Sequence, residues 1–67
     1  MKISLNNRSE EFESETLTIS DILIEKNFTF KMLVIKLNMI FIEKHNYSST
    51  YVKEGDDLQI IHLISGG

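Results

Sequence analysis

With 67 residues, ten acidic and seven basic side chains and no cysteine, this chain can form one small domain without disulfides, a cysteine-bound zinc ion or a thiol nucleophile. Its net charge of −3 argues against a nucleic-acid surface, which needs clustered Lys and Arg. The N-terminus carries no apolar leader and no apolar run exceeds four residues, so we expect a cytoplasmic protein without a membrane span.

The first elements are predicted to form a hairpin. Residues 2–6 alternate between polar and apolar, which is typical of a half-buried strand. Asn6-Asn7 provides a turn, because Asn tolerates the left-handed backbone region. A second strand over about 10–13 would direct Phe12 into the core. The glutamates of this segment are expected to form a solvated edge that discourages strand pairing, or alternatively a surface that steers a basic partner.

A helix is predicted to begin at Thr18. The Thr18 side chain can cap it, with Asp21 completing a capping box. Ile19, Ile22 and Leu23 share one helical face, and Asn27 is a plausible end of the helix.

The second half of the chain reads as three strands. Residues 32–38 alternate with Lys36 opposite the apolar face, a short strand follows over 40–42, and the last strand covers 57–64 after a tight turn at Glu54-Gly55-Asp56. We expect the phenylalanines Phe28, Phe30 and Phe41 to lie in the core. The order of elements predicts an α+β domain with a mixed sheet of four to five strands and one main helix packed on one face.

The last strand has two different faces. One carries Leu58, Ile60, His62 and Ile64; the other begins polar and becomes apolar at Ile61 and Leu63. Exposed apolar residues at this end predict a partner-docking patch formed by Ile61 and Leu63. The alternative is that a neighbouring loop covers them.

The sequence ends in Ser65-Gly66-Gly67. We expect a folded domain over 1–64 and a flexible tail over 65–67, which spans roughly 10 Å when fully extended. Gly66 lacks a Cβ and can enter a slot too narrow for other residues. The carboxylate of Gly67 is then the best candidate for a reactive group. The alternative is a chance glycine pair or a linker remnant.

Other candidate sites have weaker support. His45 and His62 have no third ligand at a motif spacing, so no metal site is predicted, and His62 is expected to be a core or half-buried residue. Asp56 and Asp57 fit a turn and a strand start better than an acid/base pair. Ser65 lacks the flanking pattern of a nucleophile elbow.

The whole chain resembles the ThiS family, the sulfur carriers of thiamine (thiazole) biosynthesis. The segments that carry the resemblance follow the order and spacing of the family: Met1-Lys2-Ile3 with Leu5-Asn6, residues 17–23, Leu37-Asn38, Tyr47, Glu54-Gly55-Asp56 and Ile64-Ser65-Gly66-Gly67. Three departures stand out. Asn7 and Met39 occupy positions where the family usually has glycine, and Glu43-Lys44 replaces a common Pro-Arg pair. Because Met39 stands where the family usually has glycine, we expect the turn there to form differently, with Asn38 taking a positive φ.

The resemblance implies a β-grasp (ubiquitin-like) fold and a carrier cycle on Gly67. A ThiF-type activating enzyme would adenylate the Gly67 carboxylate with ATP. A cysteine desulfurase or rhodanese-like donor would supply sulfur to form a thiocarboxylate, and a ThiG-type thiazole synthase would receive it. Ser65 and Gly66 would give the tail access to both enzymes. The resemblance implies no permanently bound cofactor, no catalytic side chain of the chain's own, and a monomer when free.

Two alternatives remain at this point. One is a related carrier or modifier, either a molybdopterin-synthase small subunit or a ubiquitin-like protein modifier, because these relatives share the tail chemistry. The other is a β-grasp binding module without tail chemistry.

Overall fold

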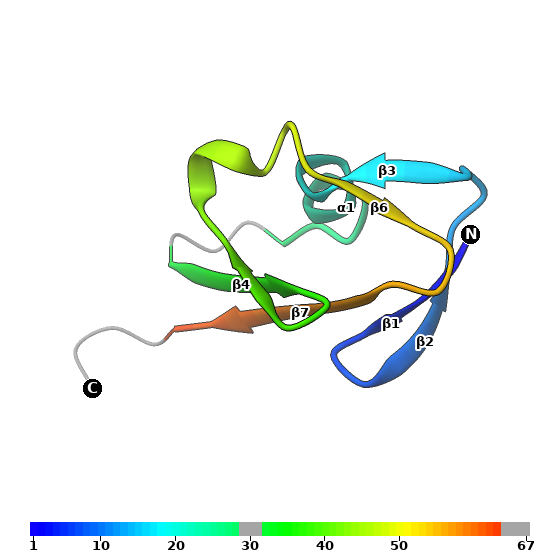
Figure 1. The fold of residues 1–67 in the computed structure, drawn as a ribbon, viewed down its shortest axis with the longest axis horizontal. Helices are drawn as coiled ribbons and strands as arrows, with labels where there is room; N and C mark the ends of the chain where they lie inside the picture. Colours follow the sequence, from blue (N-terminus) through cyan, green and yellow to red (C-terminus); the bar gives the residue numbers. More distant parts are fainter. Residues whose placement is uncertain (29–31, 64–67) are drawn as a thin grey trace.

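The computed structural model describes residues 1–28 and 32–63, whose strands form two sheets (Figure 1). The main sheet has the strand order β2-β1-β7-β4-β5. Its strands are β1 (Lys2–Leu5), β2 (Arg8–Glu11), β4 (Leu33–Leu37), β5 (Ile40–Ile42) and β7 (Asp57–His62). β1 and β7 run parallel, and the other neighbours run antiparallel. The predicted mixed sheet is therefore confirmed.

Among the described residues there is one α-helix, α1 (Ile19–Glu25), which lies on one side of the main sheet. The predicted capping box is present: Thr18 Oγ1 accepts from the N–H of Asp21 at 3.1 Å, and Asp21 Oδ2 accepts from the N–H of Thr18 at 3.3 Å. Asn27 follows the helix with φ 58°, in the left-handed region that commonly ends helices. The buried core between helix and sheets consists of Ile3, Leu5, Phe12, Ile19, Ile22, Ile35, Val52, Leu58 and Ile60.

Both hairpins of the main sheet turn through two residues with positive φ. Asn6 and Asn7 have φ values of 52° and 68°, and Asn38 and Met39 have 51° and 69°. Two successive residues in this region are typical of the type I′ turn, whose twist matches that of the flanking strands. The positive φ expected at Asn38 is confirmed, and Met39 shares it.

The sequence did not reveal a second small sheet. β3 (Thr16–Thr18) pairs antiparallel with β6 (Tyr51–Lys53), and a 3₁₀-helix, η1 (Lys44–Asn46), precedes β6. Three residues are too few to show a strand period. β2 also begins earlier than expected, although Phe12 just beyond it is buried as predicted.

Two core expectations were wrong. Phe41 is 57% exposed, because its register partner is Lys36 and both point away from α1. His62 is exposed, since β7 extends past the buried core that ends at Ile60. Phe28 packs partly buried against the core as expected. Phe30 and Ile64 lie outside the described residues.

The described part of the chain contains no helix with the length and apolar character needed to cross a membrane.

Candidate functional site

The alternation of β7 divides its side chains between the core and the outer face, which is the side of the main sheet opposite α1. Leu58 and Ile60 are buried against the core. Ile61 and Leu63 each remain 42% exposed, so no loop within residues 1–28 and 32–63 covers them. The structure therefore places both predicted docking residues on one accessible surface, and their role in docking stays a prediction.

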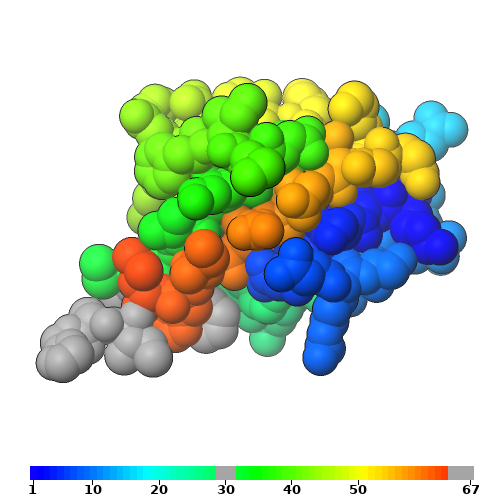
Figure 2. Space-filling model, turned by 60° about the horizontal axis from the view of Figure 1, so that its bottom comes forward, coloured from blue at the N-terminus to red at the C-terminus, as the bar shows by residue number. Residues whose placement is uncertain are grey.

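The apolar surface is larger than the sequence suggested. Ile61 lies opposite Val34 in the β4–β7 register, and the N–H of Leu63 donates to the carbonyl of Met32 at 3.0 Å. Phe41 joins them from β5, two strands away from β7. Figure 2 shows this region, with β7 between β4 and the N-terminal hairpin. We call the set the apolar patch: Met32, Val34, Phe41, Ile61 and Leu63.

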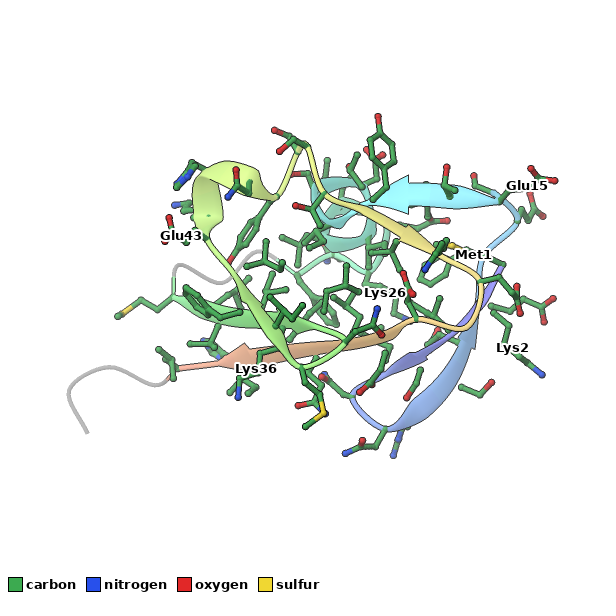
Figure 3. The ribbon with its side chains drawn as sticks, in the orientation of Figure 1. Met1, Lys2, Glu15, Lys26, Lys36 and Glu43 are labelled. Atoms are coloured by element: carbon green, nitrogen blue, oxygen red, sulfur yellow. The ribbon has the colours of Figure 1, made fainter. Side chains whose placement is uncertain are left out.

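Lys36 lies within the patch. Its register partners are Phe41 on β5 and Gln59 on β7, so side chains from both neighbouring strands flank it on the outer face. Figure 3 shows the Lys36 side chain pointing away from α1. Sequence reasoning placed Lys36 on this face but missed Phe41. If the sequence had been interpreted as a hairpin with a two-residue turn at Asn38-Met39, it would have predicted that Phe41 pairs with Lys36.

Asn38 ties the turn before β7 to the β4–β5 turn. Its Nδ2 donates to Asp56 Oδ1 at 3.1 Å, and its Oδ1 accepts from the N–H of Asp57 at 2.9 Å. Asp56 also accepts from the backbone N–H of Lys53 at 2.9 Å and from Lys53 Nζ at 3.0 Å. These bonds fix the start of the strand that carries Ile61.

The carboxylate of Asp56 is the buried charge of this network. Burial acts to raise its pKa, but the hydrogen bonds from Lys53 and Asn38 outweigh burial and hold the pKa below its ordinary value. Asp56 therefore stays ionised at neutral pH, and its carboxylate holds the turn that leads into β7. Asp57 Oδ1 is buried and has no hydrogen-bond partner among the described residues.

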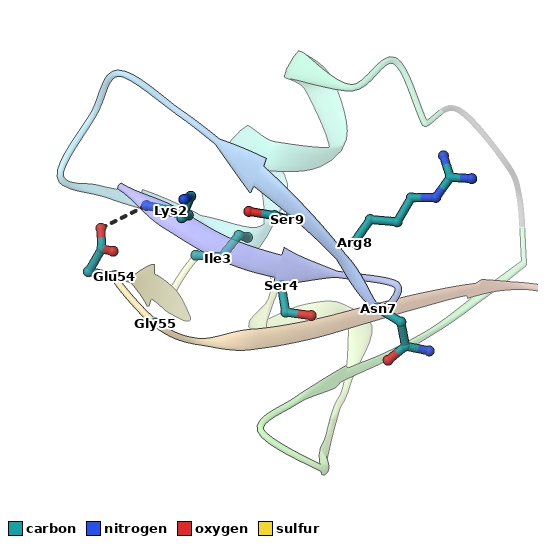
Figure 4. A pocket seen from close by; sticks show the side chains of 8 residues that line it. All are labelled: Lys2, Ile3, Ser4, Asn7, Arg8, Ser9, Glu54 and Gly55. Atoms are coloured by element: carbon teal, nitrogen blue, oxygen red, sulfur yellow. Dashed lines mark hydrogen bonds between the residues drawn. The ribbon is translucent and has the colours of Figure 1, made fainter.

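The N-terminal hairpin and the 54–55 turn enclose an open hollow of about 360 Å³ (Figure 4). Glu54 Oε1 accepts from the backbone N–H of Lys2 at 2.7 Å across it. Arg8 is among the residues that line the hollow, and Ser4 and Ser9, which also line it, are register partners on neighbouring strands. Its polar groups do not converge on one point, so we assign no ligand to it.

The described residues contain no group of three His, Cys, Asp or Glu side chains that could hold a metal ion. His45 is exposed and lies with its Nδ1 3.4 Å from Oε2 of Glu43, at the start of η1. The predicted reactive residue Gly67 and the access residues Ser65 and Gly66 lie outside the described residues. The structure thus shows the patch and the strand that leads to the tail.

Comparison with known proteins gives one family. Residues 3–67 match the sequence model of the ThiS family. The chain belongs to the ThiS family. A curated relative, the sulfur carrier protein ThiS of Bacillus subtilis (strain 168), is 26% identical over 65 residues, which cover 97% of this chain and 98% of the relative.

Solved structures show the same fold for this ThiS-family chain. The crystal structure of the thiamine biosynthesis protein (ThiS) from Geobacter metallireducens superposes with a TM-score of 0.89 at 22% identity, covering all of both chains. A solution structure of a thiamine biosynthesis protein from the same organism gives a TM-score of 0.77 at 21% identity, covering all of this chain and 88% of the other. The β-grasp fold expected from the resemblance is confirmed.

The positions where this ThiS-family chain departs from the expected glycines can now be explained. Asn7 and Met39 both have positive φ, the conformation that glycine adopts without steric cost. Asn7 tolerates it through its short polar side chain, whereas Met39 has no such advantage and is 86% exposed. Glu43-Lys44 lies at the start of η1, on the surface.

Proposed function

We propose that this chain is the sulfur carrier of thiazole formation in thiamine biosynthesis, acting through the carboxylate of Gly67. The observation that carries the proposal is the family match, which runs through Ser65, Gly66 and Gly67. The name of the Bacillus subtilis relative supports it. Both favour the thiazole pathway over a molybdopterin-synthase subunit, a protein modifier or a simple binding module.

The chemistry follows from the weakness of a carboxylate as an acyl donor. A Gly67 oxygen would attack the α-phosphate of ATP in a ThiF-type activating enzyme, releasing pyrophosphate and forming an acyl adenylate. The terminal sulfur of a cysteine persulfide on a cysteine desulfurase or rhodanese-like donor would then attack the carbonyl carbon and displace AMP, which leaves Gly67 joined to the donor cysteine through an acyl disulfide. A thiol reductant would cleave the S–S bond of this intermediate, form a disulfide with the donor cysteine and release the Gly67 thiocarboxylate. The thiocarboxylate would deliver sulfide to a ThiG-type thiazole synthase.

The carrier contributes recognition and reach rather than catalysis. The apolar patch would hold the body of the domain on a partner, while residues 65–67 enter the active site. This division of labour requires no cofactor bound to the carrier, since ATP is consumed by the partner. We propose that the protein acts as a cytoplasmic monomer between these encounters.

Substitution of the tail tests the proposal. Gly66→Val adds a branched side chain at the position that must pass through the narrow entrance, and removal of Gly67 shortens the tail by one residue, so that the terminal carboxylate, now on Gly66, falls short of the ATP. Both variants should lose ATP–pyrophosphate exchange with the activating enzyme and keep the wild-type unfolding midpoint. Ser48→Val, which places a valine at an exposed turn instead, is the control. Normal exchange with either tail variant would contradict the proposal.

A further inference from the structure

Lys36 is a cation set among apolar side chains. On the outer face it has Phe41 as register partner on one side and Gln59 on the other, while Val34 and Ile61 lie next along their strands. Phe41 is 57% exposed and Ile61 42%. A partner that covers this patch must therefore also cover the Lys36 ammonium or leave it a path to water.

Lys36 forms no ion pair with the rest of the described chain. Two other lysines do: Lys26 with Glu10 at 3.1 Å and Lys53 with Asp56 at 3.0 Å. The acidic residues at diagonal positions to Lys36 are Asp57 and Glu43, and neither lies within ion-pair distance of it. The charge of Lys36 is thus available to a partner.

Covering an unpaired ammonium with an apolar surface is costly unless a counter-charge replaces the lost water. A carboxylate on the partner would supply this counter-charge. Paired charges inside an apolar contact also fix the register of docking and reject surfaces that lack the counter-charge.

We propose that Lys36 is a specificity-determining residue, and that the activating enzyme covers the apolar patch with an apolar surface carrying a carboxylate that pairs with Lys36. This inference rests on the proposed function, which supplies the partner. The apolar patch supports it because it ends at Leu63, where the chain continues toward the tail that the enzyme must hold. The predicted docking pair Ile61 and Leu63 then forms one side of the contact, and Lys36 with Phe41 the other.

Steady-state adenylation of the full chain by the activating enzyme tests the inference. Lys36→Glu reverses the charge, and Lys36→Met keeps the apolar stem and removes the charge. Lys44→Glu makes the same change in net charge on the exposed 3₁₀-helix η1, outside the patch. We expect Lys36→Glu to raise the KM for the carrier about tenfold or more with kcat preserved. Lys36→Met should raise KM less, and Lys44→Glu should stay near the wild type.

The outcomes separate the inference from the function on which it rests. If the wild type is adenylated and Lys36→Glu has an unchanged KM, the pairing is refuted and the carrier function stands. Equal effects of Lys36→Glu and Lys44→Glu would indicate general charge steering and would also refute it. If the KM of Lys36→Met equals that of the wild type or is lower, only the apolar stem of Lys36 matters and its charge does not. If the wild type is not adenylated, the proposed function fails and the inference fails with it.

Discussion

The side-chain amide of Asn6 forms two hydrogen bonds with the backbone of Ile60. Asn6 Oδ1 accepts from the N–H of Ile60 at 2.8 Å, and Asn6 Nδ2 donates to its carbonyl at 3.1 Å. The parallel ladder between β1 and β7 covers Ser4 and Leu5, opposite Asp57 and Leu58. The N–H of Asn6 still donates to the carbonyl of Leu58 at 3.0 Å, and the Asn6 side chain extends this pairing to Ile60. It holds β7 directly before Ile61.

Asn6→Gly should destabilise the domain. Glycine keeps the positive φ but loses both hydrogen bonds, so we expect the free energy of unfolding in urea to fall by about 1–2 kcal/mol. Asn7→Gly is the matched control, because Asn7 has a similar φ and its side chain forms none of the hydrogen bonds described here. Equal stability of the two variants would show that the amide pair contributes nothing.

The low pKa of Asp56 makes stability depend on pH. A depressed folded pKa stabilises the fold above the unfolded value of about 3.9, and this contribution is lost as pH falls through the folded pKa. Asp56→Asn should therefore lower the free energy of unfolding by about 2 kcal/mol at pH 7 and by much less at a pH below the folded pKa of Asp56. Urea unfolding over a range of pH measures this. Ser48→Ala, which changes an exposed turn and no acidic group, should keep the wild-type profile, and an Asp56→Asn profile parallel to the wild type would refute the assignment.

Met39→Gly should stabilise the protein. A β-carbon at φ 69° carries steric strain of about 1–2 kcal/mol, and glycine loses about 0.5–1 kcal/mol through its greater freedom in the unfolded chain. A net gain of about 0.5 kcal/mol follows from these terms. Met39→Ala keeps the β-carbon and should match the wild type. A glycine variant that melts below the alanine variant would contradict this explanation.

Ile61→Ser should weaken adenylation without unfolding the domain. Truncating an apolar anchor in a docking surface raises KM, here by about tenfold, whereas its partial exposure limits the loss of stability. The control is Ile24→Ser on α1, an even more exposed isoleucine outside the apolar patch. If both serine variants are adenylated as efficiently as the wild type, Ile61 is not part of the docking surface.

The sequence was sufficient where a local pattern decides the structure. The capping box at Thr18 and Asp21, the paired asparagines at Asn6-Asn7 and the turn at Gly55 each depend on neighbouring residues only. β3 and β6 depend on each other across the chain, with Leu17 opposite Val52, and no local pattern reveals such a pairing in three-residue strands.

The candidate site shows the same limit. Ile61 and Leu63 were found because β7 is long enough to alternate visibly. Phe41 was assigned to the core because an aromatic residue in an apolar run is usually buried, and only its register with Lys36 places it on the outer face. The hydrogen bonds from Asn6 to Ile60 join residues far apart in sequence, so the role of Asn6 beyond the turn could not be read from its neighbours.

The most direct test of the central claim is the intact mass of the full chain after incubation with ATP, the activating enzyme and a sulfur donor. A sulfur carrier should gain the mass of one oxygen-to-sulfur exchange, located by fragmentation to Gly67 and absent without ATP. An unchanged mass under conditions where the enzyme consumes ATP, or a sulfur placed at any other residue, would contradict the claim.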